Sequence, residues 1–345
     1  SIKVNNRGFI MATYKEIKGT EIQFLDTDPT TPLVGQIWYN TASSTLKGTT
    51  AGGAAAGTWA SGGNTNTQAG QRGSASLSTN SNAFVSGGFD AGAGTVTANA
   101  ESYNGTAWTE GPNQPGTNRL GGSWGATNSY VTAGGSTGPG GTPTNATAFE
   151  WNGSSFSNGG NLNNARRNAT GAGVSETAGR VYGGGDNPGP AQALNESYNG
   201  SSFTEETDMN TARVGPVGFG TTTAAIAAGG GGTVLNELWN GSSWTELGDL
   251  TVAMSNSGGR AGTSTDGLIF SKNGTPPAAQ SCQFWDGTSW TEVADQSVNR
   301  YNNTGGGPSS ANAISVGGYG PPSAVAQATE EWSAPDFVTK TFTSS

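Results

Sequence analysis

The sequence predicts an all-β protein folded as a β-propeller, and three observations lead to this fold class. A ten-residue aromatic motif recurs six times, about every 46 residues. Five of the six copies contain Asn-Gly or Asp-Gly, the preferred pair for a tight turn between antiparallel strands. A short apolar segment, usually followed by Gly-Gly, precedes each copy. Repeats of roughly 40 to 50 residues with four short strands each are typical of propeller blades.

The aromatic motif predicts the two outer strands of each blade. Its clearest copy is ELWNGSSWTE at residues 237–246, where one aromatic precedes the turn and another follows it. The spacing between the two aromatics is the same in all six copies, so we expect each pair to fill the space between neighbouring blades. The pairs are Tyr103 and Trp108, Trp151 and Phe156, Tyr198 and Phe203, Trp239 and Trp244, Trp285 and Trp290, and Trp332 and Phe337.

The segments upstream of each motif predict the two inner strands. Each begins with a stretch rich in Gly, Ala, Ser and Thr, whose small side chains suit the crowded centre of a ring. The Gly-Gly pairs stand where a strand must stop and turn. The apolar inner strands are expected at residues 83–88, 129–135, 179–185, 224–230, 267–274 and 312–318.

The count of outer strands leaves two possible rings. Trp59 matches the second aromatic of the motif but has no inner strands before it. We expect six blades of four short antiparallel strands, with one terminus pairing with the other to close the ring. The alternative is seven blades, completed by residues 36–60. In either case residues 55–345 form the propeller, and a terminal strand that is left over lies outside it.

Residues 1–54 are predicted to form a small N-terminal β module that serves for attachment. Residues 11–48 are more charged than the rest and lack the inner-strand pattern. The segment IQFLDTDP at 22–29 indicates a strand ended by Asp and Pro, and QIWYNTASSTLK at 36–47 indicates a hairpin. Met11 is an expected start of translation, which would make the first ten residues an upstream or processed extension.

The composition excludes several classes of function. The chain has no histidine and one cysteine, which rules out Ser-His-Asp and Cys-His catalysis, an intrachain disulfide and the common zinc and copper sites. A net charge of −9 offers no basic field for nucleic acid, and no apolar run is long enough to insert in a membrane. Sialidase propellers need no histidine, but Asp286 and Gly287 are adjacent, without the residue that separates them in that turn. We therefore expect no enzyme activity, no catalytic residue, no metal and no cofactor.

Regularly spaced arginines are the candidate ligand-binding residues. If the ring interpretation is right, they form a circle on one face, each at the start of an inner strand. They would then either pair with Glu or carbonyl groups of a neighbouring blade, or bind an anion or glycan at the channel mouth. Met254 takes the fifth place, and the arginines are Arg72, Arg119, Arg166, Arg213 and Arg300.

The repeats resemble those of kelch-type propellers, which carry Gly-Gly after the second strand and spaced aromatics on the third and fourth. The order of GQIWYNTASSTLKG (residues 35–48), TWASGGN (residues 58–64) and repeats of the YNGTAWTE kind is similar to kelch-like virion proteins of marine bacteriophages. This resemblance implies a non-enzymatic virion protein of the tail-fibre or receptor-binding type, located in the extracellular particle. The N-terminal segment would bind other virion proteins, the chain would assemble as an oligomer, and the propeller would recognise a host surface polysaccharide or receptor.

Two other roles fit the same sequence. The first is a purely structural capsid or tail decoration, or a nozzle component that touches only other virion subunits. The second is a secreted or cell-surface bacterial propeller with lectin-like, adhesive properties. The sequence leaves the host, the ligand, the oligomeric state and the position in the particle open.

Overall fold

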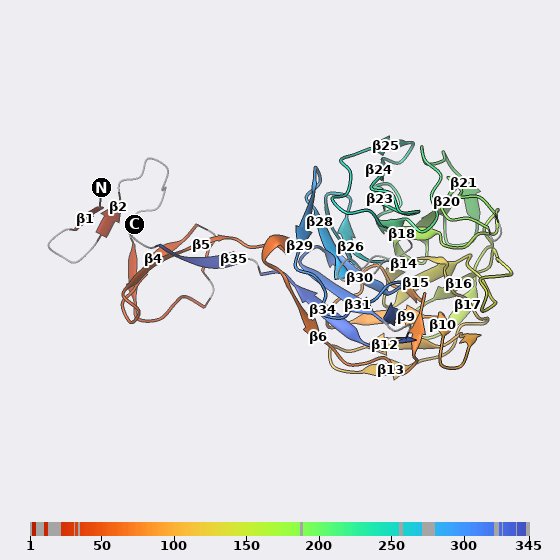
Figure 1. Ribbon diagram of the computed structural model, residues 1–345, viewed down its shortest axis with the longest axis horizontal. Helices are drawn as coiled ribbons and strands as arrows, with labels where there is room; N and C mark the ends of the chain where they lie inside the picture. Colours follow the sequence, from red (N-terminus) through yellow and green to blue (C-terminus); the bar gives the residue numbers. More distant parts are fainter. Residues whose placement is uncertain are drawn as a thin grey trace.

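The computed structural model describes residues 2–4, 10–12, 22–30, 32–33, 35–186, 189–254, 258–270, 280–320, 324–325, 327–335 and 337–342. These residues form a ring of β-sheets with a smaller sheet beside it, and one short 3-10 turn, η1 (Ala54–Ala56), precedes the ring (Figure 1). In this part of the chain no helix is long and apolar enough to cross a membrane.

Six antiparallel four-stranded sheets make up the ring. The first strands of consecutive blades lie side by side around the axis. Their small residues, such as the Gly-Ala-Gly run of β18, permit this close approach. From the axis outward, the first blade consists of β8 (Gly73–Ser74), β9 (Ala83–Ser86), β12 (Ala100–Tyr103) and β13 (Trp108–Glu110), and the second of β14 (Gly122–Ala126), β15 (Ser129–Ala133), β16 (Ala148–Trp151) and β17 (Phe156–Asn158). The third blade consists of β18 (Thr170–Ser175), β19 (Ala178–Tyr182), β20 (Asn195–Tyr198) and β21 (Phe203–Glu205), and the fourth of β22 (Val217–Gly220), β23 (Ala225–Ala228), β24 (Asn236–Trp239) and β25 (Trp244–Glu246). The fifth blade consists of β26 (Gly259–Thr263), β27 (Asp266–Phe270), β28 (Cys282–Trp285) and β29 (Trp290–Val293), and the sixth of β30 (Thr304–Ser309), β31 (Asn312–Val316), β34 (Thr329–Ser333) and β6 (Thr58–Ser61).

The sixth blade closes the ring by joining the two ends of the propeller. Its outer strand, β6, comes from the N-terminal side and pairs with β34, so that Trp59 lies opposite Trp332. The two rings lie 5.3 Å apart between centroids. The prediction of six blades closed by one terminus pairing with the other is therefore confirmed, and the seven-bladed alternative is wrong.

The last predicted hairpin does not form. Phe337 begins β35 (Phe337–Phe342), which leaves the ring and pairs with β5 (Thr45–Ala51) in the smaller sheet. Ser333 and Ala334 stand where the other copies have Asn-Gly or Asp-Gly, so the tight-turn signal is missing here. The assignment of all of residues 55–345 to the propeller is corrected accordingly, because β35 belongs to the sheet of the N-terminal module.

The module is a four-stranded sheet in the order β3, β4, β5, β35, where β3 is Gln23–Leu25 and β4 is Ile37–Asn40. β3 runs parallel to β4, and the other pairs are antiparallel. The predicted strand and hairpin are thus both present. Trp38 is fully buried and its indole N–H donates to Asp28 at 3.0 Å.

Three small sheets complete the described strands. β7 (Ala69–Gly70), β10 (Phe89–Asp90) and β11 (Thr95–Val96) form one sheet at the first blade. β32 (Tyr319–Gly320) and β33 (Ala324–Val325) form a hairpin in the sixth blade. β1 (Ile2–Val4) and β2 (Ile10–Ala12) pair near the start of the chain.

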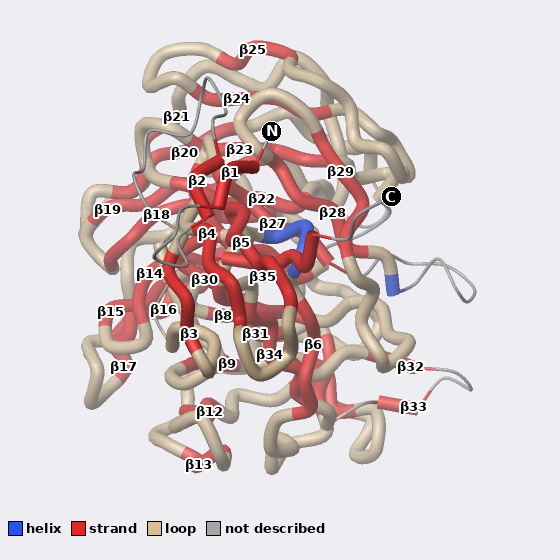
Figure 2. The backbone as a smooth tube through the Cα atoms, turned by 90° about the vertical axis from the view of Figure 1, so that its left-hand side faces the viewer, coloured by secondary structure: helices blue, strands red, loops and turns tan. Residues whose placement is uncertain are grey.

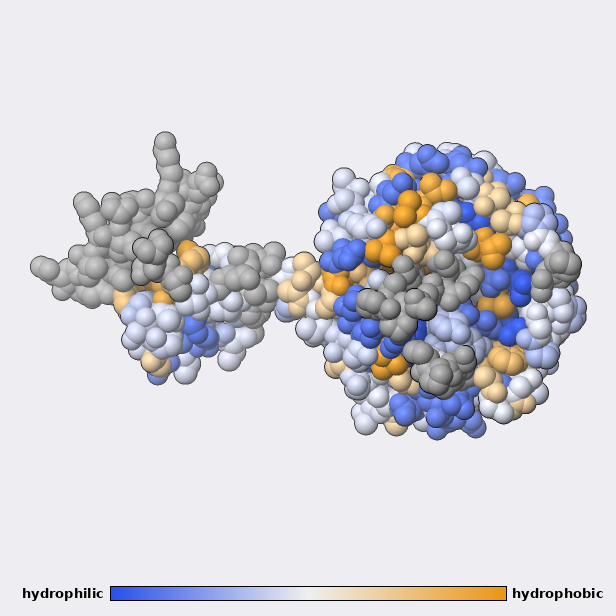
Figure 3. All heavy atoms as spheres, viewed as in Figure 1, coloured by the Kyte–Doolittle hydropathy of each residue, from blue (hydrophilic) through white to orange (hydrophobic). Residues whose placement is uncertain are grey.

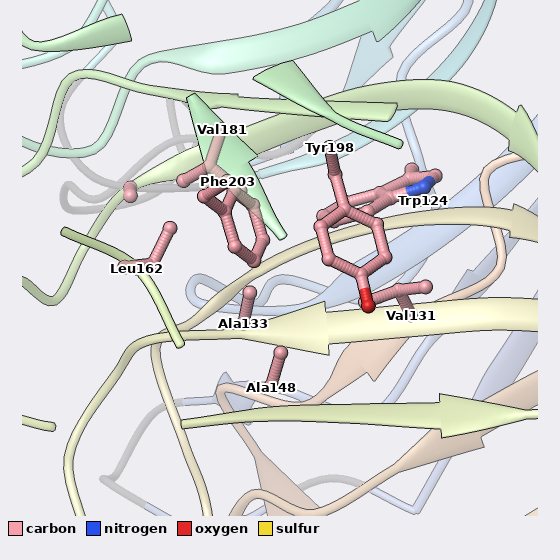
Figure 4. Packing of buried hydrophobic residues seen from close by; sticks show 9 residues of the cluster. Trp124, Val131, Ala133, Ala148, Leu162, Val181, Tyr198 and Phe203 are labelled. Carbon is pink, nitrogen blue, oxygen red and sulfur yellow. The ribbon is translucent and has the colours of Figure 1, made fainter. Parts of the chain in front are cut away.

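The core of the ring lies between the blades. Figure 4 shows one such contact, where side chains of the second blade meet those of the third. Trp124 is fully buried there, and its ring lies 5.9 Å from Tyr198 and 6.3 Å from Phe203, both in edge-to-face contact. Gly179 allows this packing, since a Cβ atom at that position would stand 2.0 Å from the Trp124 indole.

The Gly-Gly motif has a specific conformational cause. In the second blade Gly134 and Gly135 have φ values of 70° and 98°, and in the third blade Gly183 and Gly184 have 64° and 96°. Residues with a side chain rarely adopt this region of backbone conformation. The motif therefore turns the chain out of the second strand, as predicted, into the connection that leads to the third.

Candidate functional site

One face of the ring is built from tight turns that repeat from blade to blade. The turn between the third and fourth strands lies beside the turn between the first and second strands, as the contact of Gly153 with Asn128 shows. In the outer turn of the second blade, Asn152 Oδ1 accepts hydrogen bonds from the backbone N–H groups of Ser154 and Ser155, both at 3.0 Å. Asn104, Asn199, Asn240 and Asp286 make equivalent bonds. We call this side the tight-turn face.

The opposite side, which we call the loop face, carries the connections between the second and third strands. These connections differ in length and sequence from blade to blade. β32 and β33 belong to one of them and project from the ring in Figure 2. Figure 3 shows hydrophilic and hydrophobic residues interspersed over this side of the ring. The connections are residues 87–99, 134–147, 183–194, 229–235, 271–281 and 317–328, the third, fifth and sixth being described only in part.

Three of the predicted arginines occupy equivalent positions and are buried in ion pairs. Arg166, Arg213 and Arg300 are at most 2% exposed. Each stands two residues before a residue with positive φ at the centre of the ring. Their partners are carboxylates of the same blade, not of a neighbouring blade: Arg166 with Glu196, Arg213 with Glu237 at 2.8 Å and Arg300 with Glu330 at 2.5 Å.

Arg72 reaches the equivalent carboxylate from a different position. It follows the positive-φ residue Gln71 directly, and its Nη1 lies 2.7 Å from Oε1 of Glu101. Burial alone would raise the pKa of Glu101, but Arg72 and the N–H groups of Asn66 and Thr67 outweigh it and lower that pKa. The carboxylate therefore fastens the connecting segment around residues 66–67 to the third strand of its blade.

The two remaining blades replace both members of the pair. In the fifth blade Met254 stands in the arginine position and Gln283 in the glutamate position. Gln283 Oε1 accepts a hydrogen bond from Val252 N–H at 3.1 Å, so it still holds the connecting segment. In the second blade the corresponding residues are Asn118 and Phe149. The arginine–glutamate ion pair is thus present in four blades, and both of its members are replaced in the other two.

Arg119 lies one residue beyond the position that Arg166, Arg213 and Arg300 occupy in their blades. Its Nη1 donates to Gln71 Oε1 at 2.8 Å, its Nη2 donates to the Pro139 carbonyl, and its guanidinium lies 4.8 Å from the Phe89 ring centroid. Burial raises the pKa of Tyr319 nearby to about 12, although the positive charge of Arg119 acts to lower it. Arg119 is 7% exposed and braces loops of several blades at the centre of the loop face.

The predicted circle of arginines does not form an accessible binding surface in the structure. Arg72, Arg166, Arg213 and Arg300 are closed off in ion pairs, and Arg119 is bonded to other loops. The alternative, structural pairing with Glu and carbonyl groups, is confirmed, with the correction that each Glu belongs to the arginine's own blade. The surface that a ligand meets on the loop face is therefore formed by the connecting loops and not by these arginines.

The motif aromatics are likewise structural. In five blades the two rings of the motif contact each other, with centroid separations between 4.5 Å for Tyr198 and Phe203 and 5.6 Å for Trp239 and Trp244. In the sixth blade Trp59 takes the place predicted for Phe337. The other pairs in contact are Tyr103 and Trp108, whose rings are stacked, and Trp151 with Phe156 and Trp285 with Trp290, whose rings are tilted.

Sequence reasoning missed Arg260, a charged residue at the axis of the ring. It occupies the central position of the first strand, where the other five blades have only Ser or Gly. Aligning the first strands of the six repeats would have revealed it. Sequence reasoning also missed Arg167, Phe89 and Tyr319 around Arg119, because the loops that bring them together have no common pattern.

Among the described residues, no group of three or more His, Cys, Asp or Glu side chains could hold a metal ion. Cys282 is fully buried, and burial raises the pKa of its thiol, which keeps it protonated at neutral pH.

Comparisons with known proteins support the fold. No family model matches the sequence, and no curated protein matches it. Among solved structures, the chain is similar to one described as the structure of YjhT, with a TM-score of 0.62 and 10% sequence identity. The similarity covers 80% of this chain and 99% of that chain. At this identity the likeness shows the fold alone.

Proposed function

We propose that this chain is a non-enzymatic virion protein of the tail-fibre or receptor-binding type, whose loop face recognises a host surface polysaccharide. The observation that carries the proposal is the contrast between the two faces. The tight-turn face repeats one turn chemistry around the ring, whereas the loops on the other face differ in length and sequence. Binding residues are concentrated on such unlike loops held by a rigid scaffold.

The loop face offers groups that suit a carbohydrate. Thr137 and Asp186 are exposed there. The loops of the second and third blades are also joined, since Thr144 Oγ1 donates to Asp186 Oδ1 at 2.7 Å. Loops that are bonded to each other lose less conformational freedom on binding, which favours affinity.

The small module supplies a surface for attachment to other virion proteins and for assembly as an oligomer. Four large hydrophobic side chains are exposed among the described residues, and three of them, Phe24, Leu33 and Phe342, belong to the module. Leu33 is 76% exposed. Such exposed apolar groups are typical of protein contact surfaces. The ring, by contrast, contributes only Val174 to this set.

A pair of matched substitutions tests the proposal. Thr137→Arg places a long charged side chain on the loop face, and Ser154→Arg places the same side chain on the tight-turn face; both positions are exposed. Binding of the full chain to whole cells and to purified surface polysaccharide of candidate hosts is measured for each variant. We expect Thr137→Arg to weaken saturable binding at least about tenfold, which corresponds to about 1.4 kcal/mol, and Ser154→Arg to leave it unchanged.

The opposite results separate the alternatives. Equal loss in both variants, or loss only in Ser154→Arg, would show that the loop face is not the recognition surface. If the folded parent bound no host surface at all but bound other virion proteins, a purely structural decoration would be the better description.

A further inference from the structure

One buried arginine in the central channel of the propeller, Arg260, takes no part in the contacts described for the loop face. Arg260 lies on β26, at the position where the innermost strands of the other blades carry Ser74, Ser123, Gly171, Gly218 and Gly305. Its side chain crosses the axis to the second blade, where Nη2 donates to the Ser123 carbonyl at 2.6 Å and to the Ser123 hydroxyl at 3.1 Å. Arg260 is 6% exposed.

The charge of Arg260 has no carboxylate counterpart in the described part of the chain. None of the ion pairs found there includes Arg260. Its Nε is buried and has no hydrogen-bond partner among the described groups. Burial lowers the pKa of Arg260, which reflects the cost of holding a charge away from water.

The groups around Arg260 leave this charge uncompensated. Arg72 lines the same channel, but Glu101 neutralises it. Burial raises the pKa of Tyr130 to about 12 and also raises the pKa of Tyr182. Both hydroxyls are therefore neutral at neutral pH. An isolated buried charge is strongly unfavourable unless a partner of opposite charge accompanies it.

A small cavity lies beside Arg260. It has a volume of about 30 Å³ and is lined by Arg260, Arg72, Ser123, Thr170 and Thr304, among others. Such a volume holds a chloride-sized ion or one to two water molecules, and it is too small for a sugar acid. On the tight-turn side, the Ser76 hydroxyl donates to the Gly173 carbonyl at 2.9 Å, which joins the first and third blades across the channel.

We propose that this cavity binds a small monovalent inorganic anion, of the size of chloride, which neutralises Arg260 and stabilises the closed ring. The cavity lies next to the centre of the loop face, since Gln71 lines it and bonds to Arg119 there. The bound anion would stabilise the ring and would not take part in host recognition, so the inference goes beyond the proposed recognition function. Because the anion binds the folded ring and not the unfolded chain, its concentration raises the stability of the fold.

Thermal unfolding of the full chain tests the proposal, with sodium chloride exchanged for sodium gluconate at constant ionic strength. Gluconate is too large for the cavity, so general salt effects are matched. Above the dissociation constant, we expect the melting temperature of the parent to rise about 2 °C for each tenfold increase in chloride. Arg260→Gln removes the charge and should abolish this dependence, whereas Arg260→Lys should retain it.

Arg180→Gln is the matched control variant. Arg180 is also buried and is in none of the described ion pairs, and neither Arg180 nor its hydrogen-bond partners Thr222 and Asn195 line the cavity. It should melt lower than the parent and keep the same chloride dependence. Crystals grown in bromide should show an anomalous peak within hydrogen-bond distance of Arg260 in the parent, which needs no variant to fold. Equal melting in chloride and gluconate, or a cavity that holds only water in bromide, would overturn the proposal.

Discussion

Breaking the buried pair of Arg213 and Glu237 should destabilise the ring far more than replacing both partners together. Nη2 of Arg213 lies 2.8 Å from Oε1 of Glu237, and both side chains are 1% exposed. Nη1 of Arg213 donates to three backbone carbonyls, and Glu237 accepts bonds from the N–H groups of Asn210 and Thr211. The pair thus joins three segments of the fourth blade.

The expected magnitudes follow from the burial of the pair. Glu237→Gln leaves a guanidinium in the interior without its counter-charge, and Arg213→Met leaves a carboxylate there; each should cost about 3 to 5 kcal/mol of unfolding free energy. The double variant copies Met254 and Gln283, which the fifth blade uses at the same positions. It should therefore lie within about 2 kcal/mol of the parent, because no charge remains buried.

Urea unfolding of the parent and the three variants, followed by tryptophan fluorescence, gives the double-mutant cycle. We expect a coupling free energy of about 3 kcal/mol or more between the two positions. If each single variant cost under about 1 kcal/mol, or if the double variant lost the sum of the two single losses, the argument that these arginines are structural ion-pair partners would be refuted.

Two further predictions concern packing and pH. Gly179→Ala places a Cβ atom 2.0 Å from the indole of Trp124 and should lower the unfolding free energy, measured in urea, by about 3 kcal/mol. In the control variant Gly111→Ala the nearest contact of the Cβ atom would be 3.9 Å away, so the unfolding free energy should fall by under about 1 kcal/mol. Equal losses of unfolding free energy in the two variants would contradict this packing. The folded-state pKa of Glu101 lies below its ordinary value of 4.5, so its contribution to stability is fully present above that pH and is lost as the pH falls through the lowered pKa. The unfolding free energy, measured from pH 7 to pH 3, should therefore decline less steeply in Glu101→Gln than in the parent. The control variant Glu110→Gln, whose side chain is exposed, should follow the parent. Indistinguishable slopes in Glu101→Gln and the parent would show that the Glu101 carboxylate is not held in its charged form.

The ring was predictable because its signals are local. The Asn-Gly pair of a hairpin turn and a Gly-Gly pair such as Gly134 and Gly135 each indicate the backbone conformation at their own position in the chain. The constant spacing between the two aromatic residues of each motif then indicates which strands belong to one blade. The same local logic accounts for the failure at Phe337, since the sixth copy of the motif lacks the turn residues that would have folded it back.

The site was less predictable because its geometry depends on register between distant segments. Equal spacing in sequence placed Arg119 with Arg166, yet the structure aligns Arg119 with Arg167, because both lie directly before a positive-φ residue at the ring centre. A shift of one residue exchanges a buried ion pair for a contact with the loops. Whether an arginine forms an ion pair depends on whether the third strand of its blade carries a glutamate. In the sequence, the joint replacement of arginine by Met254 and of glutamate by Gln283 in the fifth repeat was the signal that the two positions are partners.

The way in which the chain joins its two parts bears on how the propeller could be displayed. The module contributes β5 before the ring begins, and it receives β35 after the ring ends. Two chain segments therefore connect the parts, and the Gly53 N–H donates to the Pro335 carbonyl at 2.8 Å between them. A single linker allows free swivelling, whereas two bonded segments restrict it and hold the loop face in a defined orientation relative to the module. The residue that closes the ring, Trp59, directly follows the first of these segments. Pulling on the module would consequently load the β6–β34 pairing of the sixth blade, so ring closure and attachment depend on the same strands.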